Sequence, residues 1–148
     1  MSDIQTIWDT TAQRGDWIIA SGALASGHDV ETAVLMSLFT DRLCDTDDII
    51  PDAPPSGLSD RRGWWGDTDP KYPIGSRLWL LDRAKGPANV ASRAEDYARE
   101  ALQWMLDDGV VAKFTITATW IPKNQITLQV VSYRADGSVV SNLSTKLW

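Results

Sequence analysis

The chain has 148 residues, of which 43% are hydrophobic, and a formal net charge of −6. This length suits one domain with a core of its own, so we expect residues 1–148 to fold as a single domain. The 14 Lys and Arg residues are scattered rather than clustered, which argues against a nucleic-acid partner. No apolar run approaches the roughly 20 residues that cross a bilayer, and the N-terminus lacks the pattern of a signal peptide. We therefore expect a protein made and kept in the cytoplasm, with no membrane partner.

Two short strands are expected at the N-terminus. The alternation of Ile4, Thr6 and Trp8 has the period of a strand, and residues 17–20 form a second one after a polar turn at residues 13–16. These strands predict a short N-terminal hairpin.

A first helix is predicted for residues 30–43. Asp29 can cap it, and Glu31 lies in the first turn, where a carboxylate favours the helix dipole. Its apolar residues recur at helical spacing and are Val30, Val34, Leu35, Leu38 and Phe39.

Residues 44–75 differ in kind from the rest of the chain. Eight aspartates lie between Asp41 and Asp69, and five prolines accompany them. Proline removes backbone donors, and Asp and Gly favour turns, so a long helix or strand is excluded here. The middle of the stretch, residues 61–67, contains paired arginines and paired tryptophans, which is not the composition of a disordered linker. We predict a long irregular loop at about residues 44–75 that is ordered and binds a partner.

Two more helices are predicted after this loop. Ser76 can cap a helix over residues 77–85, and Gly86-Pro87 would stop it. The next helix covers residues 90–107, where Ala, Leu, Met and Tyr form one apolar stripe before Gly109.

The last part of the chain predicts an antiparallel sheet. A strand at residues 114–120 alternates apolar residues with threonines, and a second strand returns from Ile126. An Asp-Gly turn at residues 135–138 leads into residues 139–148, which form a third strand or a trailing arm. The fold class is therefore α+β, with a short N-terminal hairpin, about three helices and a C-terminal antiparallel sheet.

Eight tryptophans are many for a chain of this size. Tryptophan is usually buried, so we expect most of them in the core. Tryptophan is also enriched at protein interfaces, so some of them should face partners.

The sequence contains no complete catalytic or metal-binding pattern among those of the common enzyme and metal-site classes. His28 is the only histidine and precedes a helix, where a surface or capping role is the ordinary one. Cys44 is the only cysteine and lies beside several aspartates, which disfavour a thiolate. The acidic residues 45–48 lack the central Gly and closing Glu of an EF-hand loop. We therefore expect no enzyme activity, no metal, no cofactor and no small-molecule substrate.

One stretch of sequence resembles a known family. The block Arg61-Arg62-Gly63-Trp64-Trp65-Gly66-Asp67 is followed by Gly75-Ser76-Arg77-Leu78-Trp79-Leu80-Leu81. Both segments, together with the later helix and paired strands, resemble the Mu-like phage baseplate protein family. That family is similar to the small wedge subunit of T-even phages and to the lysozyme-like baseplate subunit of type VI secretion systems. The Glu-Pro-Arg signature of this broader group is absent, so only the block from Arg61 to Asp67 carries over.

The resemblance implies a structural baseplate wedge subunit of a contractile phage tail. Such a subunit joins the hub, the wedge core and the first sheath ring, and templates sheath assembly through strands that pair with neighbours. It would be assembled in the host cytoplasm and reside in the virion tail baseplate, with other baseplate wedge, hub and sheath proteins as partners. We expect the partner-binding residues to be those of the double-tryptophan block and the apolar residues of the C-terminus: Arg61, Arg62, Gly63, Trp64, Trp65, Gly66, Asp67, Leu143, Leu147 and Trp148.

Two alternatives stay open at this point. A peptidoglycan-cleaving, lysozyme-like hydrolase needs only two carboxylates, and Asp67 and Glu100 are its candidates. Another tail or neck connector would differ from a wedge subunit only in its neighbours.

Overall fold

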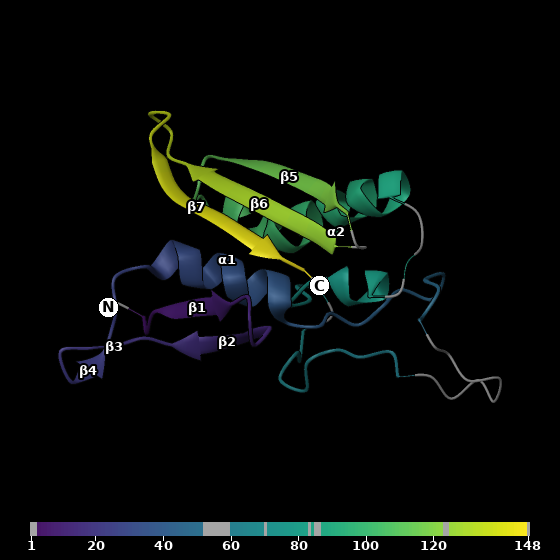
Figure 1. Cartoon of the computed structure of the whole chain (residues 1–148), viewed down its shortest axis with the longest axis horizontal. Coiled ribbons are helices and arrows are strands. Elements are labelled where there is room, and N and C mark those ends of the chain that lie inside the picture. The colour runs from purple at the N-terminus through teal and green to yellow at the C-terminus, as the bar shows by residue number, and fades with distance from the viewer. Residues whose placement is uncertain are drawn as a thin grey trace.

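The computed structural model describes residues 3–51, 60–69, 71–82, 84, 87–122 and 125–147. Three layers follow one another in Figure 1: the C-terminal sheet, the two helices, and a pair of small N-terminal sheets. The N-terminal strands are β1 (Thr6–Asp9), β2 (Arg14–Trp17), β3 (Ile19–Ala20) and β4 (Ala23–Leu24). They are followed by α1 (Asp29–Phe39), the 3₁₀ turn η1 (Leu78–Leu81), α2 (Pro87–Asp107), β5 (Lys113–Ile121), β6 (Gln125–Tyr133) and β7 (Val139–Lys146).

The C-terminal sheet is antiparallel in the order β5-β6-β7. Its strands alternate as the sequence indicates, since Ile116, Leu128 and Leu143 point to the buried face and the intervening residues point outward. The turn between β6 and β7 needs Gly137, whose φ is +84°, and Asp136 Oδ1 accepts a hydrogen bond from the backbone N–H of Ser138. This Asp-Gly turn is the one that the sequence predicts.

The helix α2 covers the buried face of this sheet and supplies much of the core. Its apolar stripe includes Ala94, Ala98, Leu102 and Met105, each fully or almost fully buried. Together with α1 and η1, these side chains form one continuous hydrophobic cluster. No described helix is long and apolar enough to cross a membrane.

The predicted count of about three helices with a single C-terminal sheet is wrong. In the described residues the segment expected as a helix over residues 77–85 forms only the 3₁₀ turn η1. All four residues of η1 are buried, so the segment has no exposed face and needs no amphipathic helical period. Pro87, expected to stop a helix, instead begins α2, where its missing N–H costs nothing. The N-terminus also contains a second small sheet, in which β3, inside the strand predicted at residues 17–20, pairs with β4, a strand that the sequence does not predict.

The helix α1 ends at Phe39, earlier than the predicted residue 43, because the chain turns to pair with a distant segment. Thr40 adopts an extended backbone, and its carbonyl accepts a hydrogen bond from Ser76 N at 2.9 Å. Arg42 N donates in turn to Ser76 O at 3.0 Å. The hydroxyl of Ser76 donates to the carbonyl of Leu38 at 2.5 Å, which satisfies one of the last acceptors of the helix. The end of the long loop is thereby fixed against the end of α1.

This pairing predicts a strong effect of adding one methyl group at Gly75. A Cβ at this position would lie 2.3 Å from the carbonyl oxygen of Thr40, and Gly75 has a φ of +92°. We expect Gly75→Ala to lower the free energy of unfolding by about 3 kcal/mol, as measured by urea denaturation. Gly137→Ala is the matched control, because its φ is similar and nothing lies within 4 Å of the added Cβ. It should cost about 1 kcal/mol, and equal losses for both variants would contradict the clash.

Candidate protein-interaction site

Residues 60–69 contain no helix or strand, yet they are tied to the segment that follows α1. The Arg61 backbone carbonyl accepts a hydrogen bond from Cys44 N at 3.3 Å, while the Arg61 guanidinium donates to the Cys44 carbonyl at 2.9 Å. Arg62 forms an ion pair with Asp41 at 2.7 Å. The chain then reverses through two left-handed residues, Arg62 (φ +47°) and Gly63 (φ +109°). Backbone and side-chain contacts therefore both fix the start of the double-tryptophan block.

The two indoles project from a tight turn. Asp67 N donates to the carbonyl of Trp64 at 3.0 Å, and the Asp67 carboxylate accepts a hydrogen bond from Ile74 N at 3.1 Å. The ring of Trp64 lies so close to Gly66 that a Cβ there would be 2.4 Å from the ring. The side chain of Trp65 is 91% exposed and that of Trp64 is 42% exposed, with ring centroids 5.5 Å apart. The turn thus presents apolar area that the described part of the chain does not cover.

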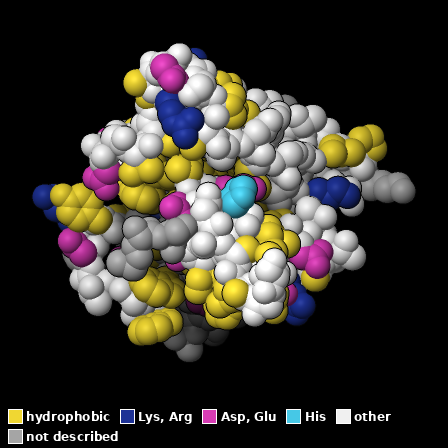
Figure 2. Space-filling model, turned by 90° about the vertical axis from the view of Figure 1, so that its left-hand side faces the viewer, with side chains coloured by type: hydrophobic (Ala, Val, Ile, Leu, Met, Phe, Trp, Pro, Cys, Tyr) yellow, Lys and Arg dark blue, Asp and Glu magenta, His cyan; other side chains and the backbone are white. Residues whose placement is uncertain are grey.

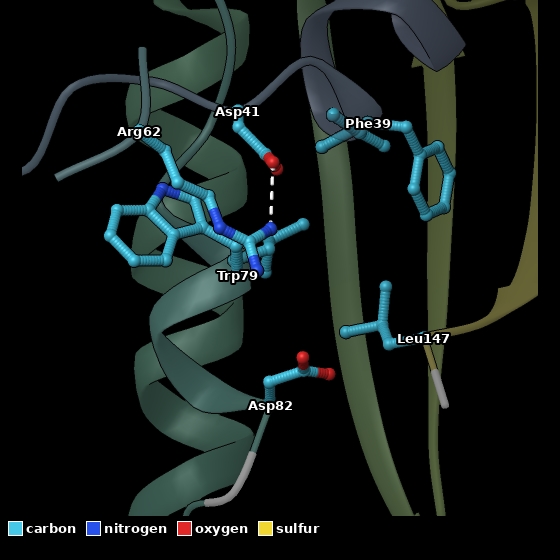
Figure 3. A pocket seen from close by; sticks show the side chains of 8 residues that line it. Phe39, Asp41, Arg62, Trp79, Asp82 and Leu147 are labelled. Atoms are coloured by element: carbon cyan, nitrogen blue, oxygen red, sulfur yellow. Dashed lines mark hydrogen bonds and ion pairs between the residues drawn. The ribbon is translucent and has the colours of Figure 1, made fainter. Parts of the chain in front are cut away.

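A small pocket brings the two predicted partner-binding segments together. Figure 3 shows Arg62 lying over the ring of Trp79, with its guanidinium carbon 5.0 Å from the ring centroid. Leu147 lies on the opposite wall, and Asp82 points into the space between them. The pocket volume is about 110 Å³, below the roughly 300–1,000 Å³ of a small-molecule site. It can receive a side chain from a partner, but its size does not suit a polymer substrate.

The structure describes two of the three C-terminal residues predicted to bind a partner, and these two differ in their exposure to solvent. Leu143 is buried in the core on the inner face of β7, so its side chain offers no free surface. Leu147 is half-buried, and its backbone N–H donates to Ile126 O at 2.9 Å, which continues the pairing with β6 beyond the end of β7. Trp148 lies outside the described residues.

The two outer edges of the sheet differ. On β5, the N–H of Ala118 points away from β6 and donates to Glu95 Oε1 of α2 at 3.0 Å. On β7, the hydrogen bond from Leu147 to Ile126 fixes the alternation, so the N–H groups of Asn142 and Ser144 point away from β6. Both residues are exposed, and within the described residues no hydrogen bond reaches those two N–H groups. The edge of β7 therefore carries two N–H groups that no described hydrogen bond uses, and α1 packs against the same strand.

Arg77 connects the segment after α1 to α2. Its guanidinium donates to both carboxylate oxygens of Glu100 at 3.0 and 3.2 Å, and also to Asp45 at 2.7 Å and Asp48 at 2.9 Å. The same group lies 4.9 Å from the ring centroid of Tyr97. Burial alone would lower the pKa of Arg77, but the hydrogen bonds that its guanidinium donates to Asp48 and Glu100 outweigh this effect and hold the pKa above its ordinary value. Arg77 therefore stays charged and holds three carboxylates.

The sequence does not reveal the Arg77 network. Its members are 23 to 32 residues apart, and no spacing rule joins an acidic turn to a distant arginine. The acidic residues 45–48 match no EF-hand loop in the sequence, and the structure shows that Asp45 and Asp48 form ion pairs with Arg77.

The tryptophans are more exposed than expected. Of the seven that the structure describes, Trp79 alone is buried, whereas Trp8 and Trp120 are half-buried. The remaining four are exposed, namely Trp17, Trp64, Trp65 and Trp104. The expectation that most of them are in the core is wrong for these seven.

Removing Arg77 should destabilise the protein much more than removing a surface arginine. Arg77→Ala leaves the partly buried Asp48 without the cation that it contacts and leaves Glu100 with only the 3.7 Å ion pair to Arg42, so we expect a loss of about 2 kcal/mol in urea denaturation. Arg99→Ala is the control, since Arg99 also contacts two carboxylates, Glu95 and Asp96, but its side chain is largely exposed. It should cost at most about 0.5 kcal/mol. Similar losses for the two variants would mean that Arg77 is an ordinary surface ion pair.

Comparison with known proteins supports the predicted resemblance. The family model for the phage protein GP46 matches residues 30–139. The chain is 39% identical to the baseplate protein gp46 of Escherichia phage Mu over 140 residues, which cover 95% of this chain and 92% of that protein. It is 30% identical to the Mu-like prophage FluMu protein gp46 of Haemophilus influenzae, over 100% of this chain and 98% of that protein. The chain therefore belongs to the GP46 family of phage proteins, the family of Mu-like baseplate proteins that its double-tryptophan block predicts.

Proposed function

We propose that this chain is a structural subunit of the baseplate wedge of a contractile phage tail. It joins the hub, the wedge core and the first ring of sheath, and it templates sheath assembly. It is assembled in the host cytoplasm and acts by binding other baseplate proteins. The Mu relative is named as a baseplate protein, which supports the structural role; the wedge and sheath contacts are our own inference.

The observation that carries this proposal is the exposed pair of indoles on a loop that is held in place. Large apolar side chains on a fixed surface lose little conformational entropy on binding, which is why tryptophan dominates many interface hot spots. Arg61 and Arg62 fix one side of the turn, and Asp67 fixes the other through Ile74. The turn is therefore prepared to enter a partner's pocket without further ordering.

The open edge of β7 supports the second part of the proposal. An exposed strand edge accepts an extended segment from another protein through main-chain hydrogen bonds. Since Glu95 occupies the middle of the β5 edge, a strand of a sheath or wedge neighbour would add at β7. Lys146 and Ser144 lie on this strand and are exposed, so no core side chain has to move.

The hydrolase alternative has no specific observation in its favour. Both oxygens of Glu100 accept hydrogen bonds from Arg77, and one oxygen of Asp67 accepts from the backbone of Ile74. Glu100 and one oxygen of Asp67 therefore serve structural contacts, while Asp67 Oδ1 is buried without a hydrogen-bond partner among the described residues.

Substituting Trp65 separates docking from folding. Because its side chain is 91% exposed, Trp65→Ala should change the free energy of unfolding by less than about 0.5 kcal/mol. Loss of an interface tryptophan costs about 2 kcal/mol or more, roughly 30-fold in affinity, so tail assembly should fall sharply. The assay is trans-complementation of a phage whose own copy is inactivated, with complete tails counted by electron microscopy. Met36→Ala, an exposed apolar substitution on α1, should assemble normally, and normal tails from Trp65→Ala would exclude docking through this turn.

A proline at Ser144 tests the edge of β7 without deleting a core strand. Ser144→Pro removes an outward-facing N–H, and proline is tolerated on edge strands at such positions, so we expect a stability loss of only about 1 kcal/mol. Sheath should no longer form on the baseplate, because the incoming strand loses a hydrogen bond and meets the proline ring. Ser144→Ala keeps the N–H and should behave as wild type. Sheathed tails of normal length with Ser144→Pro would exclude strand addition at β7.

A further inference from the structure

The N-terminal residues form a folded unit that contributes no buried residue to the protein. We call residues 3–27 the N-terminal arm. Gln5 N donates to Ala25 O and Ala25 N donates to Ile18 O, both at 2.8 Å, so the two small sheets close on one another. Within the described part of the chain, the first fully buried residue is Thr32, beyond the arm. The arm is therefore ordered outside the hydrophobic core.

The arm is attached to the body on one side only. The ring of Trp8 stacks on Phe39 of α1 with ring centroids 3.8 Å apart, and Thr6 N donates to the hydroxyl of Thr32 at 3.1 Å. Both contacts come from β1, and Figure 1 shows β1 next to α1 with β2 on its far side. The strands β2, β3 and β4 are exposed along their whole length.

The exposed side of the arm is rich in large apolar side chains. Trp17 is 61% exposed and Ile19 is 74% exposed. Figure 2, which looks onto the end of the molecule that carries the arm, shows hydrophobic side chains at several places on this surface, including its lower part. Two-stranded hairpins are marginally stable in water, and contiguous exposed apolar area marks an interface. The further exposed apolar side chains of the arm are Ile4, Ile7 and Leu24.

The outer edge of β2 is suited to accept a strand. Its inner edge pairs with β1 in the register Thr6↔Trp17 to Asp9↔Arg14. On the outer edge, Gly15 has no side chain, and the N–H of Trp17 is engaged only by the neighbouring carboxylate of Asp16 at 2.8 Å. An extended segment can therefore pair with β2 while its apolar side chains cover Trp17 and Ile19.

The charge of the arm indicates what kind of segment would bind. The arm contains the carboxylates Asp3, Asp9 and Asp16 against the single cation Arg14, and Arg14 already lies 3.6 Å from Asp16. Hydrogen bonds from the backbone of Ala12 and Thr11 lower the pKa of Asp9, which keeps this carboxylate ionised at neutral pH. A second copy of the chain would bring the same excess of carboxylates and a net charge of −6.

We propose that the N-terminal arm is a further docking site, which receives an extended strand of a neighbouring baseplate protein, apolar at alternate positions and basic rather than acidic. This inference rests on membership of the baseplate family and not on the proposed contacts of Trp65 or β7. The arm precedes residues 30–139, which the family model matches, whereas the alignment with the Haemophilus relative spans the whole chain. The arm thus adds a contact outside the segment that defines the family.

Hydrogen exchange compares the free chain with the chain in purified tails. The backbone amides of residues 14–20 should exchange at least about 10-fold more slowly in the tail, because a paired strand covers them. The same exchange rate in the tail and in the free chain would overturn the proposal. It would also be overturned if the free chain showed the same slow exchange and became slower as its concentration rose, because the occupant would then be a second copy of the chain. Protection at Trp65 without protection at residues 14–20 would refute the arm and leave the proposed wedge role standing.

Competition for incorporation tests the chemistry of the partner. Wild-type and variant chains are co-expressed, and their ratio in purified tails is measured by mass spectrometry. The variant Trp17→Ser with Ile19→Ser should be at least about 10-fold under-represented, whereas Ile49→Ser, which changes an isoleucine that is 86% exposed elsewhere, should not. Asp16→Lys should be excluded in the same way, and Asp107→Lys, which makes the same charge change at the end of α2, should not. Equal incorporation of Asp16→Lys and Asp107→Lys would contradict the proposal that the partner segment is basic.

Discussion

Ser76 and the residues that end α1 hold each other through three hydrogen bonds, and this contact positions the double-tryptophan block, which we propose as a docking surface. Thr40 accepts from Ser76, Ser76 accepts from Arg42, and the Ser76 hydroxyl donates to Leu38. Gly75 is required next to it, because a side chain there would enter the space of the Thr40 carbonyl. Backbone groups at the end of a helix need partners, and here they obtain them from a segment more than thirty residues away.

Further contacts extend from this pairing in both directions. Trp79, just after Ser76, donates its indole N–H to the carbonyl of Arg42 at 2.8 Å, and its ring supports the guanidinium of Arg62. Arg77 binds Asp45 on one side and Glu100 of α2 on the other. The segment after α1 is therefore held from two sides, by the double-tryptophan block and by the residues around η1. A loop without regular secondary structure can present Trp64 and Trp65 in a fixed position only because of such contacts.

The sequence predicts the parts of the fold that depend on local periodicity. The strands around Ile116 and Leu128, the Asp-Gly turn at Gly137 and the stripe of α2 follow from spacing alone, because each pattern repeats along one element. It mispredicts elements whose form is decided by distant contacts. The α1 helix ends early because Thr40 pairs with Ser76. The four residues of η1 are all apolar and buried, so their sequence has no amphipathic helical period. The block from Arg61 to Asp67 identifies the family correctly, although nothing in its sequence shows that Asp41, Cys44 and Trp79 support it.

The distribution of stability in the chain is consistent with a protein that completes its fold inside an assembly. The core lies between α1, η1, α2 and the sheet, and the arm reaches it only through partly buried residues such as Trp8, which stacks on Phe39. The arm, the double-tryptophan turn and the edge of β7 each leave exposed apolar area or strand-edge N–H groups, and such surfaces can pair with another protein. A free subunit with these surfaces would tend to associate with other proteins, and the net charge of −6 opposes association with copies of itself. The same acidity favours basic neighbours, so the charge of the chain and its exposed apolar residues together select assembly with other proteins over self-aggregation.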